Sequence, residues 1–292
     1  MTITATMVKE LRERSGAGMM DCKKALVDSK GDLEQAIEFL RKSGASKAEK
    51  KAGRIAAEGV IAIRENEESL VLIEINCETD FVAKDENFKN FVDFIGQLAL
   101  DKKITHIDKL KRALSNGESV DEALTQLSAK VGEKIDVRRL AFVEKSAHTV
   151  GVYNHGDRIG AVAIASGGKV ENVRDIAMHV AASNPLALNE QEIPDSVLQK
   201  EREIQLAQAS DSGKPPEIVE KMVKGRMKKF LAENTLLGQP FVKDPECKIS
   251  EYAKNNDFKL VAFYRFEVGE GIEKRKENFA DEVAAQAKNS GN

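Results

Sequence analysis

The feature that most restricts the fold of this chain is a series of strand and helix patterns that appears twice in the same order. The second copy is weaker than the first. Each copy has two apolar runs of strand type around a polar turn, then an amphipathic helix, and later a closing strand. The first copy covers residues 60–64, 70–75, 86–100 and 135–143, and the second covers residues 150–153, 159–165, 170–182 and 259–268. Two subdomains of one plan, each built from strands and helices, predict an α+β fold.

The helix expected at residues 86–100 carries a regular apolar pattern. Its large apolar side chains recur at spacings of three and four residues, which places them on one helix face. These side chains are Phe88, Phe91, Val92, Ile95 and Leu98. Helical composition continues to about residue 131, so we expect helix to fill the space before the closing strand.

The beginning of the chain predicts a small three-helix domain. The expected helices lie at about residues 4–14, 19–29 and 32–43. Gly16 and Gly31 stop the first two helices, because glycine readily adopts the left-handed conformation that ends a helix. Asp32 begins the third helix as its N-cap, and Gln35 completes a capping box. We expect this helix to end at residues 43–44.

A basic stretch follows at residues 41–54 and has two interpretations. Its charged residues are Arg41, Lys42, Lys47, Glu49, Lys50, Lys51 and Arg54. A linker or solvated helix is one interpretation, and a patch that binds RNA or the ribosome is the other. No aromatic side chain that could stack on bases is interleaved. We therefore expect a linker and no direct contact with nucleic acid.

An insert before the last strand predicts two antiparallel helices, at residues 196–209 and 216–234. Residues 211–215 separate them, with a glycine that can stop one helix and a proline suited to open the next. We expect one helix to face the other through Val197, Ile204 and Ala207 against Ile218, Met222 and Gly225. The apolar stripe is narrow, which favours a protruding arm over a hairpin folded onto the core. Such an arm is a candidate contact for a homodimer or for a two-to-two complex with a partner.

Composition limits the class of protein. The chain has 292 residues, 41% of them hydrophobic and 32% charged, with a net charge of −3. No basic field attracts nucleic acid or a membrane surface, and no run has the length of a signal peptide or membrane span. The three cysteines are far apart and odd in number, which favours reduced thiols in the cytoplasm.

The sequence lacks the usual marks of an enzyme. Its four histidines form no metal motif, and its two Gly-Lys pairs lack the rest of a phosphate-binding loop. Residues 269–271 suggest a dinucleotide turn, but Lys274 replaces the third glycine, so we interpret them as a strand exit. A hydrolase built on His155 would need a base and nucleophile pair that the sequence does not show. We therefore predict a protein-binding protein with no catalytic residue, cofactor or metal.

Four segments, at residues 11–26, 77–84, 155–160 and 265–274, together carry a family resemblance. They read LRERSGAGMMDCKKAL, CETDFVAK, HGDRIG and RFEVGEGIEK. In this order, with the insert between the last two, they make the chain similar to bacterial elongation factor Ts over essentially its whole length. The resemblance implies guanine-nucleotide exchange on elongation factor Tu during translation.

The resemblance also implies which residues contact the partner. In this family the loop that matches residues 79–82 wedges beside the nucleotide site of the GTPase and disturbs Mg²⁺ coordination. The implied partner-binding residues are Met19, Met20, Thr79, Asp80, Phe81, Val82 and His155. Asn154 stands where some relatives carry Gln, a small departure.

Local structure offers another account of each of these residues. Asp80 can be a cap, Phe81 can pack under the next helix, the methionine pair can be core with one side chain outward, and His155 can be a turn residue.

We expect five units along the chain. These are a helical docking domain and linker at 1–54, a first core subdomain at 55–148, a second at 149–187 with 237–271, a helical hairpin insert at 188–236, and a C-terminal module with a short helix at 272–292.

Overall fold

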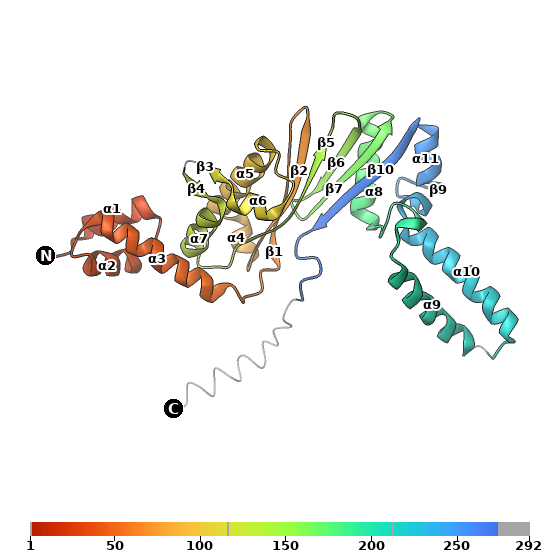
Figure 1. Cartoon of the computed structure of the whole chain (residues 1–292), viewed down its shortest axis with the longest axis horizontal. Helices are drawn as coiled ribbons and strands as arrows, with labels where there is room; N and C mark the ends of the chain where they lie inside the picture. Colours follow the sequence, from red (N-terminus) through yellow and green to blue (C-terminus); the bar gives the residue numbers. More distant parts are fainter. Residues whose placement is uncertain (1, 116, 212, 274–292) are drawn as a thin grey trace.

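The computed structural model describes residues 2–115, 117–211 and 213–273, and within residues 45–50 it describes the backbone only. The architecture is α+β, as predicted. A helical N-terminal region lies at one end, two sheets form the centre, and a helical hairpin extends from the other end (Figure 1). The short helix expected in the C-terminal module lies outside the described residues.

The N-terminal region has the three predicted helices, α1 (Ala5–Ser15), α2 (Met19–Asp28) and α3 (Leu33–Lys51). Gly16 ends α1 with a φ of 67°, in the left-handed conformation expected of it. Their apolar faces meet in a small core. Its buried members are Leu11, Cys22, Ala25, Leu26 and Ala36.

Helix α3 begins after Asp32, which caps it as predicted, but it differs from the prediction in its capping box and in its end. At its start Asp32 Oδ1 accepts the Gln35 N–H at 3.0 Å, but the Gln35 side chain donates to the Asp32 carboxylate instead of accepting from its backbone, so the capping box is incomplete. The predicted end at residues 43–44 is wrong. Gly44 is buried inside the helix, where a Cβ would lie 3.5 Å from the Ala129 side chain of α7 (Val120–Val131). Packing against α7 therefore carries α3 past its glycine.

The first sheet contains β1 (Glu58–Glu65), β2 (Ser69–Cys77) and β5 (Asp136–Glu144), all antiparallel in the order β1-β2-β5. Asn66 shapes the β1–β2 turn by accepting the Glu68 and Ser69 N–H groups. Helix α5 (Glu86–Asp101) covers one face of this sheet. All five side chains predicted for its inner face are buried.

Helix does continue to residue 131, as expected, but in two separate elements. Between α5 and α7 the chain forms α6 (Ile107–Arg112) and a two-stranded ribbon of β3 (Leu114–Ser115) and β4 (Glu118–Ser119). Helix α7 begins with a full capping box, in which the Ser119 hydroxyl accepts the Glu122 N–H and the Glu122 carboxylate accepts the Ser119 N–H. These local caps and the ribbon divide the region.

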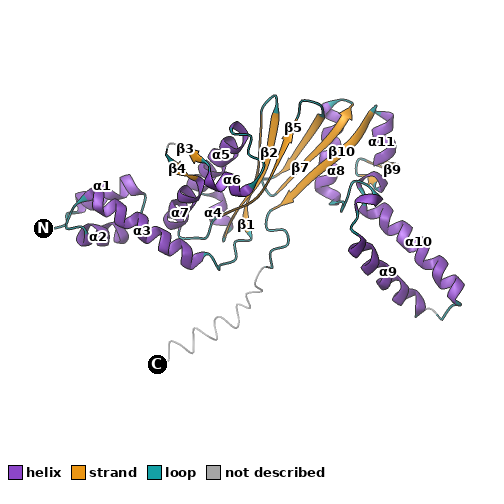
Figure 2. Ribbon diagram, viewed as in Figure 1, coloured by secondary structure: helices purple, strands orange, loops and turns teal. Residues whose placement is uncertain are grey.

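The second sheet repeats the plan of the first. It contains β6 (Thr149–His155), β7 (Ile159–Gly167) and β10 (Phe258–Glu267) in the order β10-β7-β6, covered by α8 (Val170–Ser183). The two sheets pack through their other faces, which contribute Ile61, Leu72, Val162, Ile164 and Phe266. A Cβ on Gly160 would lie 2.6 Å from the Ile61 side chain, so the sheets approach closely there. Helices thus lie outside a double layer of strands (Figure 2).

The insert between α8 and β10 begins with a short 3-10 helix, Glu190–Glu192, and then forms α9 (Asp195–Ser210) and α10 (Pro216–Asn234). These two helices project from the core as an arm (Figure 1). After a second 3-10 helix, Leu236–Gly238, the chain forms β8 (Pro240–Phe241), β9 (Asp244–Lys248) and α11 (Ile249–Asn255), which the sequence did not predict.

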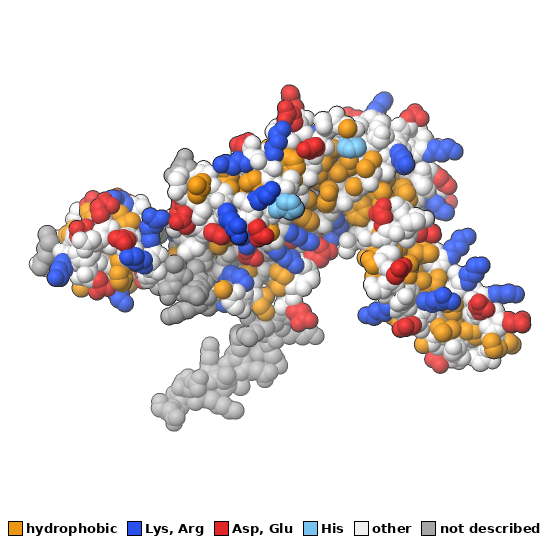
Figure 3. Space-filling view, viewed as in Figure 1, with side chains coloured by type: hydrophobic (Ala, Val, Ile, Leu, Met, Phe, Trp, Pro, Cys, Tyr) orange, Lys and Arg blue, Asp and Glu red, His pale blue; other side chains and the backbone are white. Residues whose placement is uncertain are grey.

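The predicted seam between the two arm helices is wrong at four of its six residues, although Met222 packs against the buried cluster as predicted. Ala209, Val219 and Val223 are buried between them, whereas Ile204 and Ile218 are exposed. Ala207 and Gly225 are exposed as well. Positions 219 and 223 lie one turn apart on the same face, and position 218 lies about 100° away. Apolar side chains therefore remain on the outside of the arm (Figure 3).

Within the described parts of the chain, no helix combines the length and apolar character needed to cross a membrane.

Candidate protein-binding site

The connection from β2 to α5, residues 78–85, presents the most exposed large hydrophobic side chain that the structure describes. Phe81 is 80% exposed. The connection was predicted as a loop, but it contains the short helix α4 (Asp80–Lys84), with Thr79 as its N-cap. We call residues 78–85 the α4 connection.

The orientation of α4 follows from which of its side chains reach the core. Val82 and Ala83 are half-buried against the core of the first subdomain, so Asp80 and Phe81 face outward. Lys84 Nζ lies 2.7 Å from Asp80 Oδ2, one helical turn away. The hydrogen bond from Lys84 lowers the pKa of the Asp80 carboxyl, which stays ionised. The connection thus offers an exposed ring beside a carboxylate.

The base of the α4 connection is fixed by Glu133, which lies between α7 and β5. Its Oε2 accepts the N–H groups of Glu78 and Thr79, both at 3.0 Å, and its Oε1 accepts the Thr79 hydroxyl at 2.6 Å. No pattern in the sequence singles out Glu133. Glu133 lies 54 positions after Thr79, a separation that follows no spacing rule that would have joined them.

A second set of contacts joins the same base to the end of the basic stretch. Glu78 Oε1 accepts the Lys134 N–H at 2.6 Å and lies 3.3 Å from Arg54 Nη1. Lys134 Nζ donates to the carbonyl of Ala52 at 2.7 Å. The chain that leaves the N-terminal region is therefore tied to the connection that carries Phe81.

The methionine pair borders a groove of about 410 Å³ between α1 and α2. Met19 and Met20 are 60% and 75% exposed, so both point outward, where one had been expected to. The groove is lined by Ile3, Thr4, Ala5, Val8, Lys9, Arg12, Met19, Met20 and Lys23. An apolar floor with three cations at its rim suits an amphipathic segment that carries acidic groups.

His155 ends β6, opposite Ile159, beside a turn in which Gly156 and Asp157 have φ values of 55° and 57°. Two positive φ values are the geometry of a tight hairpin turn. The Tyr153 hydroxyl lies 3.3 Å from His155 Nδ1, and the two rings stack. His155 therefore has the turn position expected of it.

The structure brings two of the three predicted contact regions to one end of the first sheet. Ile61 N–H in β1 donates to the carbonyl of Asp157, and Arg158 pairs with Glu58 at 2.7 Å. Glu58 lies opposite Cys77, the last residue before the α4 connection. The His155 turn and α4 thus border the same end of β1, while the groove beside Met19 lies in the separate N-terminal region (Figure 1).

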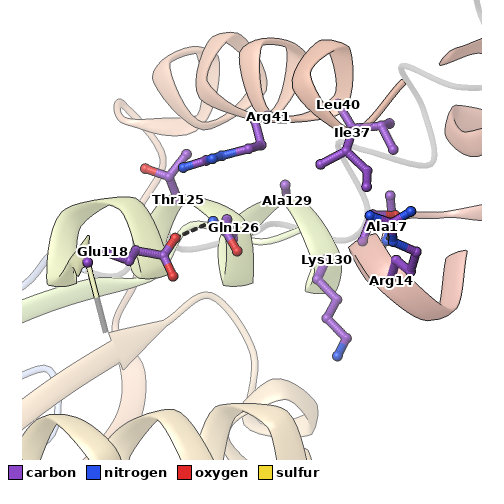
Figure 4. A pocket seen from close by; sticks show the side chains of 13 residues that line it. Arg14, Ala17, Ile37, Leu40, Arg41, Glu118, Thr125, Gln126, Ala129 and Lys130 are labelled. Carbon is purple, nitrogen blue, oxygen red and sulfur yellow. Dashed lines mark hydrogen bonds between the residues drawn. The ribbon is translucent and has the colours of Figure 1, made fainter. Parts of the chain in front are cut away.

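A cleft of about 360 Å³ separates the N-terminal region from α7, with Ile37 and Ala129 pointing into it (Figure 4). Its three cations have partners: Arg14 pairs with Glu34, Arg41 with Glu122 and Lys130 with Asn87. We interpret the cleft as the space between two packed units.

The titratable groups of the described core are structural. His179 is buried, and burial lowers its pKa while Nε2 bonds to Gln239 Oε1 at 2.9 Å. Burial raises the pKa of the Cys77 thiol to about 12, so it is not a nucleophile at neutral pH. Over residues 2–115, 117–211 and 213–273, no three His, Cys, Asp or Glu side chains are placed to hold a metal ion.

Comparison with known proteins gives one consistent family. The family profile described as Elongation factor TS matches residues 78–270. Elongation factor Ts of Thioalkalivibrio sulfidiphilus is 54% identical over 99% of both chains, and that of Alkalilimnicola ehrlichii is 52% identical over 99% of this chain and 100% of its own. Elongation factor Ts of Aeromonas hydrophila subsp. hydrophila is 54% identical over 97% of both chains. The chain therefore belongs to the elongation factor Ts family of translation elongation factors.

Proposed function

We propose that this protein is a guanine-nucleotide exchange factor that binds elongation factor Tu and promotes release of GDP during translation elongation. It performs no chemistry of its own and needs no cofactor. Family membership supports this role. The observation that carries the mechanism is the 80% exposure of Phe81 beside the ionised Asp80, on a helix anchored to the core.

The Asp80–Phe81 pair acts as a wedge beside the nucleotide and Mg²⁺ site of the partner. Mg²⁺ neutralises the phosphates of GDP, so displacing the groups that support it weakens GDP binding. Burial of the exposed ring stabilises the nucleotide-free complex by roughly 1.5–3 kcal/mol. Because coupling is reciprocal, GDP weakens binding of this protein by the same factor.

The proposed partner-binding residues divide by how the structure holds them. Met19, Met20, Asp80, Phe81 and His155 offer exposed side chains for contact. Thr79 and Val82 are half-buried and set the position of α4. Contacts from the N-terminal groove and from the α4 end of the core would hold the partner at separate points.

The predicted units become proposed functional units. Residues 1–54 dock the partner, residues 55–148 carry the wedge, and residues 149–187 with 237–271 support it. The hairpin at 188–236 joins two copies through a groove of about 410 Å³, lined in part by Leu206. A role in translation places the protein in the cytoplasm.

The structure weakens the RNA-binding alternative. Lys51 donates to the carbonyl of Ser128, and Arg54 pairs with Glu78, so part of the basic stretch is engaged within the protein. If the basic stretch did bind RNA, its cations would neutralise phosphates and release counterions, so the affinity for RNA would fall steeply as the salt concentration rises.

The direct test is release of fluorescent GDP from elongation factor Tu after addition of substoichiometric amounts of this protein. We expect faster release with repeated turnover, and weak binding of RNA at physiological salt. A stable complex that leaves the release rate unchanged would contradict the proposal, as would tight, salt-sensitive RNA binding without exchange.

A further inference from the structure

We infer that Glu133 is a positioning residue for exchange: its carboxylate holds the start of α4 so that Phe81 projects in one direction before the partner arrives. The inference rests on the proposed wedge role of Phe81. Glu133 lies behind the connection that carries the ring and acts on it through Thr79.

The contacts of Glu133 are concentrated on the α4 connection. Its two carboxylate oxygens accept three hydrogen bonds, from the backbone of Glu78 and from both the backbone and the hydroxyl of Thr79. Hydrogen bonds to an ionised acceptor are shorter and stronger than those between neutral groups. One side chain therefore fixes two successive peptide groups and a side-chain rotamer.

Thr79 passes this constraint to α4. Its hydroxyl donates to Glu133, and the same oxygen accepts the Val82 N–H at 3.3 Å as the N-cap of the helix. Helix α4 has only five residues, far fewer than an isolated helix needs for stability. Its direction therefore depends on the cap and on the packing of Val82, and the cap depends on Glu133.

Glu133 is itself held on a firm support. Gly132 ends α7 with a φ of 83°, and the Ser128 hydroxyl donates to the Glu133 carbonyl at 2.5 Å. The next residue, Lys134, donates its N–H to Glu78. The support comes from α7, the helix on which Gly44 of α3 packs.

Preorganisation is the physical benefit. A connection that is already ordered loses little conformational entropy when it enters the partner, so more of the contact energy becomes coupling to GDP release. Without Glu133, Phe81 would remain present and exposed, but the chain would have to order it during binding.

The first test measures the order of the connection in the free protein. The chain contains three tyrosines but no tryptophan, so Phe81→Trp introduces a single tryptophan that can be excited at wavelengths where tyrosine does not absorb. We expect Glu133→Ala to lower the time-resolved anisotropy of this reporter markedly and Glu133→Gln to lower it less, because glutamine keeps an acceptor for the two N–H groups. Glu68→Gln is the matched control, since this exposed carboxylate pairs with Lys103 near the opposite end of β2. It should leave the anisotropy unchanged.

The second test is a double-mutant cycle on GDP release from elongation factor Tu. Glu133→Ala should reduce the acceleration by about tenfold and Glu133→Gln by about threefold, with Glu68→Gln unchanged. Because Glu133 acts through Phe81, the double variant Phe81→Ala/Glu133→Ala should exchange no more slowly than Phe81→Ala alone.

The outcomes separate the inference from the proposed function. An unchanged anisotropy in a folded Glu133→Ala protein would overturn the inference, and so would additive losses in the cycle. Normal exchange by Phe81→Ala would instead overturn the wedge role, while the anisotropy of the free protein still reports whether Glu133 orders the connection.

Discussion

The two subdomains of the core have the same strand order, and each has one helix on its outer face, α5 in the first half and α8 in the second. They differ in how the central strand is joined to that helix. In the first half, β2 leads through the α4 connection, with a further helix and an exposed aromatic ring. In the second half, β7 ends at Gly167, and only Gly168 and Lys169 precede α8. One connection carries an exposed ring, and the other has only two residues.

The short connection leaves no room for a side chain at its two glycines. Gly167 and Gly168 have φ values of 80° and 77°, and a Cβ on Gly168 would lie 2.7 Å from the Phe258 side chain. In the long connection, Glu133 from a neighbouring part of the first half accepts the backbone N–H groups of Glu78 and Thr79. One scaffold therefore supports both a closed turn and the connection that we propose as a binding element, so function would depend on the local insertion.

The closest approach of helix to sheet also differs between the halves. Substitutions at these points should have the largest effect on the free energy of unfolding. A Cβ on Gly151 of β6 would lie 2.2 Å from the α8 backbone, whereas one on Gly96 of α5 would lie 2.9 Å from the side chain of Arg64. We expect Gly151→Ala to lower the free energy of unfolding by about 3 kcal/mol, because backbone cannot move aside. Gly96→Ala should change it by less than about 1 kcal/mol, since the Arg64 side chain can shift.

Urea denaturation of both variants measures this contrast. Equal decreases in the free energy of unfolding would show that both helix–sheet interfaces accommodate an added methyl group equally well. The halves would then differ only in their connections.

Phe81→Ala gives the next largest effect and tests the difference between the connections directly. We expect about tenfold slower GDP release, equivalent to ~1.4 kcal/mol of lost coupling, with little change in melting temperature. Val170→Ala is the matched control, because Val170 begins α8 at the corresponding place and is 56% exposed. It should leave exchange unchanged.

Stopped-flow release of fluorescent GDP, together with a melting curve, checks both variants. Early melting of Phe81→Ala with normal exchange per folded molecule would mean that the ring stabilises the core. Equal losses from both variants would remove the functional distinction between the halves.

Local patterns predicted the repeated part of the fold. Alternating strands around polar turns, and the apolar face of α5, depend on residues close in sequence. The ribbon of β3 and β4 has two residues in each strand, too few for any periodicity. The extension of α3 through Gly44 depends on Ala129 of α7, a contact that no local pattern contains.

The candidate site was predictable only in part. The resemblance pointed to Phe81, but its exposure depends on Val82 and Ala83 packing inward, which five residues of helix do not determine. Glu133 could not be found from spacing, because the fold alone brings it to Thr79.

The two halves should also differ in the pH at which acid destabilises them. The core of the second half contains His179, whose pKa burial holds below its ordinary value of 6.5. As the pH falls below 6.5, the unfolded chain binds a proton that the folded protein resists, so stability decreases. The first half contains the buried Glu74. Its burial would raise its pKa, but hydrogen bonds from Gly269 and Asn76 and the charge of Arg139 hold it below its ordinary value of 4.5.

Stability contributed by Glu74 is therefore present above its ordinary pKa and is lost only as the pH falls below about 4.5. Between pH 7 and 5 we expect the free energy of unfolding to fall, and to fall less in His179→Gln, which does not titrate. Hydrogen exchange should show opening of α8 before α5. Parallel pH profiles for parent and variant would contradict this assignment.

The smallest expected effect on the core comes from removing the arm, which is present only in the second half. Its buried side chains form a cluster of their own, Ala209, Val219 and Val223, separate from the core cluster beneath α8. The arm's base is already closed, because Leu186 N–H donates to the Asn234 carbonyl and Leu236 N–H donates to the Ala187 carbonyl. Replacing residues 199–228 with a short Gly/Ser link should therefore change the unfolding free energy of the core by less than about 1 kcal/mol.

Light scattering of the same variant tests the proposed contact between copies. If exposed Ile204, Leu206 and Ile218 join two arms, the parent should have the mass of a dimer and the shortened protein that of a monomer. Leu206→Asp should give the same monomer without shortening the chain, because a buried unpaired carboxylate is costly. A shortened protein that stays dimeric would assign the contact to another surface, and loss of its cooperative unfolding would show that the second half, unlike the first, needs its insert to fold.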